Sequence, residues 1–156
     1  MKTSTQLLST ALLGLAGLAG LALSQSAHAV LGGAASTVQE DRMQMKAAVP
    51  AASAKLNYTV HEMTLPSGTE VREYIAGDKV FAIAWRGPVI PDLKQLMGPY
   101  FDTYISEARS NHNSHTHLAI RHPELVMHAA GHMRAYAGSA YIPSMLPEGV
   151  KAVDIN

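Results

Sequence analysis

Apolar residues recur at spacings of three and four across residues 93–108, which is the clearest helix signal in the sequence. Pro99 lies inside this run and lacks the amide hydrogen that a helix needs, so we expect a helix of about 91–109 with a kink near Pro99. Strand-like runs lie on both sides of it. This order predicts an α+β fold, in which the helix packs across one face of an antiparallel sheet of about six strands.

The strand signals are short alternating runs separated by turn residues. They fall at 58–65, 70–75 and 80–85 before the helix, and at about 115–121, 125–130, 132–137 and 140–142 after it. Pro123 and Gly138-Ser139 mark two of the later turns, and Gly131 is either a bulge within one long strand or a turn between two. Trp85 ends a run that is apolar on both faces, so we expect it to be the largest core residue.

Residues 1–29 carry the pattern of a Sec-type signal peptide. Lys2 supplies the positive charge, residues 7–23 are uncharged and rich in Leu, Ala and Gly, and Ala27-His28-Ala29 is a small-residue cleavage site. The alternative is a retained membrane anchor, for which the run is short of the usual span of about 20 residues. With cleavage after Ala29, the protein is exported to the periplasm or the medium and keeps no membrane span.

The segment from 30 to 57 is rich in alanine and has no aromatic residue. By itself it cannot bury enough apolar surface to offset its loss of backbone entropy, so we expect a flexible tether. The remaining residues, 58–156, then form a single α+β domain.

Charge and cysteine content exclude several classes of protein. The chain has 12 basic and 12 acidic residues, which gives no clustered positive charge for nucleic-acid binding. It has no cysteine. Disulfides, cysteine-based zinc sites, iron–sulfur clusters and cysteine nucleophiles are therefore excluded.

Several ordered motifs together resemble a known family. They are GTEVREY at 68–74, VFAIAW at 80–85, GP at 87–88, PDL at 91–93, GHMRA at 131–135 and LPEGV at 146–150. The sequence resembles the domain-of-unknown-function family 2844, small exported proteins found mainly in proteobacteria. The resemblance implies an exported protein of this architecture. It implies no activity, and the histidine-rich loop is not part of the family pattern.

The histidines are the residues with the most evident chemistry. His112, His115 and His117 form the pattern His-x-x-His-x-His. On a strand, His115 and His117 would project from one face about 6.6 Å apart, a workable separation for two imidazoles on Zn²⁺ or Cu²⁺. Arg121 on the same face would repel a cation. The alternative is a solvated histidine-rich loop without metal.

A second candidate site combines His132 with Arg134, at alternate positions of one predicted strand, and adds Arg72 from an earlier strand. An imidazole and two guanidinium groups can hold a carboxylate or a phosphate. The alternative is that Arg134 forms an ion pair with Glu70 or Glu73 across the sheet.

We therefore expect an exported protein that binds a ligand or has a structural role in the envelope, with an envelope protein as a conceivable partner, and without catalytic activity. No Gly-x-Ser-x-Gly motif is present, and Ser139 reads as a turn residue. The runner-up is a periplasmic metal-binding protein that uses His112, His115 and His117. A third alternative is an enzyme whose site, around His132, Arg134 and Arg72, is assembled from distant parts of the chain. No cofactor other than Zn²⁺ or Cu²⁺ is indicated.

Overall fold

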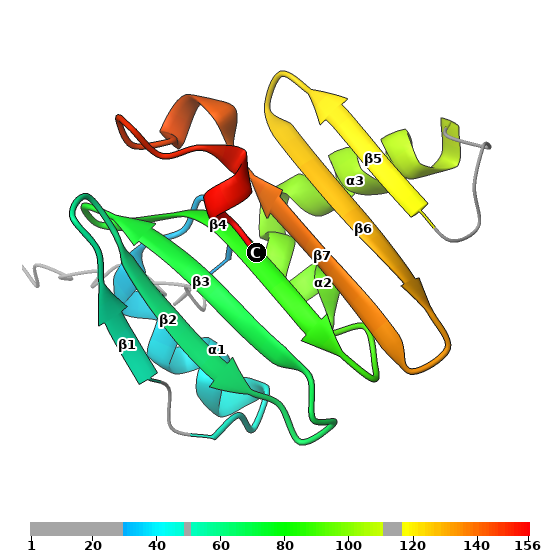
Figure 1. The fold of residues 1–156 in the computed structure, drawn as a ribbon, viewed down its shortest axis with the longest axis horizontal. Coiled ribbons are helices and arrows are strands. Elements are labelled where there is room, and N and C mark those ends of the chain that lie inside the picture. Colours follow the sequence, from blue (N-terminus) through cyan, green and yellow to red (C-terminus); the bar gives the residue numbers. More distant parts are fainter. Residues whose placement is uncertain (1–29, 49–50, 111–116) are drawn as a thin grey trace, which may run out of the picture.

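The computed structural model describes residues 30–48, 51–110 and 117–156. Its centre is a seven-stranded antiparallel sheet with the order β1-β2-β3-β4-β7-β6-β5 (Figure 1). The strands are β1 Ala51–Ala54, β2 Thr59–Thr64, β3 Glu70–Ala76, β4 Lys79–Gly87, β5 His117–His122, β6 Leu125–His132 and β7 Ala135–Tyr141. The α-helices are α1 Val38–Gln44, α2 Leu93–Met97 and α3 Phe101–Ser110. The fold is α+β as predicted, with seven strands rather than about six.

The predicted kink lies where proline breaks the helix. A 3-10 turn, Gly98–Tyr100, separates α2 from α3, and Gly98 has a φ of 50°. Asp92 caps α2, and its carboxylate accepts a hydrogen bond from the amide of Gln95 at 3.1 Å. Within the described part of the chain, no helix is long and apolar enough to cross a membrane.

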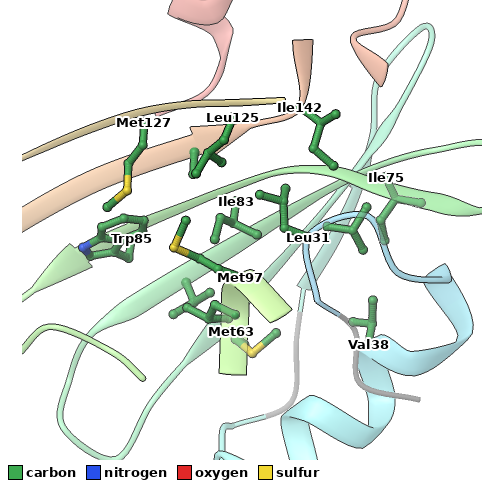
Figure 2. Packing of buried hydrophobic residues seen from close by; sticks show 14 of the residues in the cluster. Leu31, Val38, Met63, Ile75, Ile83, Trp85, Met97, Leu125, Met127 and Ile142 are labelled. Carbon is green, nitrogen blue, oxygen red and sulfur yellow. The ribbon is translucent and has the colours of Figure 1, made fainter. Parts of the chain in front are cut away.

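All three helices cover the same face of the sheet, which leaves the opposite face to the C-terminal segment (Figure 1). The main core lies under the helices. Figure 2 shows Ile83 and Trp85 from β4, Met97 from α2 and Met127 from β6 in this core. Leu96 from α2 belongs to the same cluster. Leu96, Met97 and Ile83 are fully buried. Closing this core therefore requires side chains from both halves of the sheet.

The described residues of the segment 30–57, which are 30–48 and 51–57, do not form the flexible tether that we predicted. Leu31 and Val38 are 0% and 1% exposed, and Figure 2 shows both within the main core cluster. The amide of Leu31 donates to the carbonyl of Leu96 at 2.9 Å, and β1 pairs with β2. The composition of this segment does not indicate its burial, because the residues that bury it lie elsewhere in the chain. Its few apolar side chains fill positions in a core that the sheet and α2 provide. The predicted signal peptide, residues 1–29, lies outside the described residues.

The last hairpin also differs from the prediction. Gly131 lies within β6, and the turn is formed by Met133 and Arg134, the latter with a φ of 64°. Gly138-Ser139 is not a turn but the middle of β7. The reason is a close approach. Gly138 pairs with Trp85 across the sheet, and a Cβ on Gly138 would lie 2.3 Å from Cζ2 of the indole. Glycine is required here by packing rather than by chain reversal.

The C-terminal segment covers part of the open face. Ile155 is 4% exposed and packs with Tyr74 and Phe81. The rings of Tyr74 and Phe81 meet at a centroid distance of 6.1 Å in an edge-on arrangement. Figure 1 shows this segment in front of the sheet, with the C-terminus between β4 and β7. The face over the adjoining ends of β4, β7, β6 and β5 remains open.

Candidate functional site

A trough of about 410 Å³ lies on the open face, beside the C-terminal segment. Two neighbouring rows of side chains, running across the strands, form it. The first row crosses β3, β4, β7, β6 and β5 in that order, and each residue in it pairs with the next. It consists of Arg72, Ala84, Ser139, His128 and Ala119. In the second row Glu70 lies opposite Arg86, then come Ala137, Ala130 and His117. Two rows of one face are separated by about 6.8 Å.

The floor of the trough consists of small side chains. Ala84, Ser139, Ala137 and Ala130 lie next to one another on β4, β7 and β6. The solvent-exposed face of an antiparallel sheet ordinarily carries polar side chains, which are hydrated. Here methyl groups and one hydroxyl line a flat surface that is recessed between larger neighbours. The hollow therefore results from the small side chains at these positions and is not a general feature of α+β folds.

Charged and polar side chains form the two walls. On one side Glu70, Arg72 and Arg86 rise from β3 and β4, with Ile155 and Asn156 of the C-terminal segment beside them. On the other side His128 and His117 rise from β6 and β5. The lining therefore holds two guanidinium groups, two imidazoles and one carboxylate around an apolar floor.

The two arginines differ in their surroundings. Nε of Arg72 lies 2.8 Å from Oε1 of Glu62, and its Nη2 lies 3.8 Å from Oε2 of Glu70. Nη1 of Arg72 also donates to the carbonyl oxygen of Asn156. Arg86 is exposed, and no ion pair or hydrogen bond links its side chain to any residue that the structure describes. Arg72 is thus part of the wall, whereas the donors of Arg86 are available to a ligand.

Tyr74 holds the C-terminal segment against this wall. Its hydroxyl donates to the carbonyl oxygen of Asn156 at 2.9 Å and accepts from the amide of Asn156 at 3.0 Å. Burial raises the pKa of the Tyr74 phenol above its ordinary value, although the hydrogen bond with Asn156 opposes this effect. The phenol therefore stays protonated at neutral pH and keeps both bonds.

The structure separates the three residues of the predicted anion site. Arg72 lies on β3, whereas His132 ends β6, and β4 and β7 lie between these strands. Arg134 is an exposed turn residue, so it does not alternate with His132 along a strand as we expected. The alternative ion pairs of Arg134 are not favoured either. Glu70 lies near Arg72, and Glu73 is fully buried on β3, opposite His61.

The predicted metal site falls mainly outside the described residues, because His112 and His115 are not among them. His117 begins β5 and is exposed, on the side that carries Ala119 and Arg121, as predicted. Among residues 30–48, 51–110 and 117–156, no group of three or more His, Asp or Glu side chains is arranged to hold a metal ion. A site that includes His112 and His115 stays a prediction.

Arg86 was not among the predicted site residues, and Ser139 was predicted to be a turn residue. The signal that could have found them is the repeated small outward side chain in Ala84-x-Arg86, Ala137-x-Ser139 and His128-x-Ala130. Each of these pairs is unremarkable alone. They become a site only through the pairing of β4 with β7 and of β7 with β6.

The fold and the trough define a small α+β protein with helices on one face of a single sheet and a hollowed, partly open opposite face. Residues 27–155 match the model of the family described as "Protein of unknown function (DUF2844)", and the chain belongs to this family, as its motifs indicated. No curated protein matches the chain, and no solved structure matches it.

Proposed function

We propose that this is a non-enzymatic binding protein that holds a small organic molecule in the trough. The observation that carries the proposal is the floor of small side chains on an open sheet face, bordered by convergent polar groups. A volume of about 410 Å³ falls within the usual range of small-molecule sites. A mostly apolar surface with a few polar groups at its border is the common composition of such sites.

The surroundings of Ser139 favour binding over catalysis. His128 lies directly opposite Ser139, and an imidazole in this position could serve as the base for a serine nucleophile. However, β7 is paired on both sides, with β4 and with β6, so its backbone amides are engaged in the sheet. The amides of Ser139 and its neighbours in β7 are therefore not free to stabilise a developing oxyanion.

Filling the floor tests this proposal. We expect Ser139→Phe to weaken binding of the uncharged fluorescent probe N-phenyl-1-naphthylamine by about tenfold or more, because the benzyl group occupies the space that the probe needs. The matched control is Ser106→Phe, which places the same ring on an exposed position of α3, on the other side of the sheet. Thermal unfolding establishes that both variants are folded. Equal affinity of the two variants and the original protein would contradict the proposal.

We also propose that the protein is exported. The support is the signal-peptide pattern of residues 1–29 and the position of its cleavage site. Cleavage after Ala29 would retain Leu31, whose side chain is fully buried. Expressed in a Gram-negative host, the protein released by osmotic shock should begin at Val30 on N-terminal sequencing. A chain that starts at Met1 and stays in the cytoplasmic fraction would rule export out.

A further inference from the structure

We propose that the ligand of the trough is an organic anion, whose acidic group pairs with Arg86 and whose flat apolar body lies on the floor. This inference rests on the proposed function, because it assigns the chemistry of the molecule that the trough holds. It follows from three properties of the lining. These are its charge, the difference between the contacts of Arg72 and those of Arg86, and the shape of its floor.

The charges of the lining favour a negative ligand. Arg72 is already compensated, because its Nε lies 2.8 Å from Oε1 of Glu62 and its Nη2 lies 3.8 Å from Oε2 of Glu70. Arg86 forms no such ion pair with any residue that the structure describes. The positive charge that an anion in the trough would meet is therefore that of Arg86.

Arg86 is the group that would receive the acidic function. The Nε and Nη2 atoms of Arg72 face the carboxylates of Glu62 and Glu70, and its Nη1 is bonded to Asn156. Arg86 stands in the next row on β4, directly opposite Glu70, but no contact between the two side chains brings them within ion-pair distance. A guanidinium with free donors binds a carboxylate, sulfonate or phosphate through two parallel hydrogen bonds.

The floor determines the rest of the molecule. Ser139, Ala137 and Ala130 span two adjacent strands and two rows of the face, and buried Ala84 of β4 borders them in the cluster that contains Ile155. None of these side chains extends beyond a methyl or hydroxymethyl group. A planar ring system can therefore lie flat on the floor, with His128 and His117 at its far edge.

Two probes with one ring system separate the contribution of charge from that of shape. 1-Anilinonaphthalene-8-sulfonate carries a sulfonate, and N-phenyl-1-naphthylamine has the same rings without it. The full chain should bind the sulfonate about tenfold more tightly, as expected for one charge-assisted contact. Arg86→Gln should reduce the ratio of the two affinities, measured on the same variant, to about one. Arg109→Gln, a matched exposed arginine on α3, should leave both affinities unchanged.

The outcomes distinguish this inference from the proposed function. Equal affinity for both probes, or a sulfonate preference that survives Arg86→Gln, overturns the anion assignment. If binding of the neutral probe remains sensitive to Ser139→Phe in that case, the trough is still the binding site. If Ser139→Phe affects neither probe, the proposed function itself fails. Loss of the sulfonate preference in Arg109→Gln would show nonspecific attraction to surface arginines and would also overturn the assignment.

Discussion

Replacing Leu31 with alanine is expected to lower the free energy of unfolding by about 2–5 kcal/mol, the usual cost of truncating a fully buried leucine. Leu31 is 0% exposed and packs in the main core with Ile83 and Met97. Its neighbours are anchored as well, since the amide of Gly32 donates to the carbonyl of Val80 at 2.7 Å. The cavity left by the substitution lies between β4 and α2, where backbone on both sides limits relaxation.

Urea unfolding followed by the fluorescence of Trp85, the only tryptophan, measures this effect. The matched control is Leu56→Ala, because Leu56 is 97% exposed and its truncation should change stability by less than about 0.5 kcal/mol. Equal, small effects at the two positions would mean that residues 30–57 do behave as a tether, which is contrary to the structure.

Gly138→Ala should be the second strongly destabilising substitution, by about 1–3 kcal/mol or more. The new Cβ would lie 2.3 Å from Cζ2 and 2.7 Å from Cε2 of Trp85. Trp85 is 4% exposed, so its ring cannot move aside without displacing other core residues. The expected result is a lower midpoint in chemical unfolding, followed by circular dichroism because the tryptophan signal itself will change.

A double-mutant cycle with Trp85→Phe identifies the cause of this destabilisation. Phenylalanine lacks the second ring that Gly138 accommodates, so Gly138→Ala should cost clearly less in the Trp85→Phe background. Additive effects of the two substitutions would show that the glycine is needed for another reason, such as its backbone conformation.

Much of the fold could be predicted because its signals are local. The spacing of apolar residues between 93 and 108 indicated a helix, and Pro99 indicated its interruption; both features are present as α2, the 3-10 turn and α3. Three of the four strands before this helix, β2, β3 and β4, were also predicted nearly to their ends, because turn residues border them, whereas β1 was not predicted. These patterns depend on neighbours in the sequence rather than on distant contacts.

The errors share a different cause. Leu31 and Val38 are buried by residues far along the chain, so the composition of residues 30–57 could not indicate their burial. Gly138 was predicted to lie in a turn, because the sequence does not show its pairing with Trp85. That pairing is the reason why a glycine lies inside this strand. In both cases the deciding contact is long-range.

The same limit applies to the site. Arg72 lies in the lining of the trough, but its predicted companions do not lie beside it. His132 ends β6, two strands beyond β4 in the sheet, and Arg134 lies in the turn that follows. Arg86 and Ser139 could be recognised only from the register between β4 and β7. A single sequence shows the alternation of apolar and polar residues within each strand, but it does not show the order of the strands in the sheet.

That order has a consequence for how the chain folds. The ladder between β4 and β7 pairs Gly87 with Tyr136, residues about fifty positions apart, while the other ladders join strands that follow closely in the chain. Closing so long a loop is entropically the most expensive pairing in the sheet. Because the floor of the trough crosses this ladder, the trough exists only when the two halves of the sheet have docked. A molecule bound in the trough would therefore contact both halves of the sheet across the β4–β7 ladder. The free energy of unfolding would then rise as the fraction of protein with bound ligand rises.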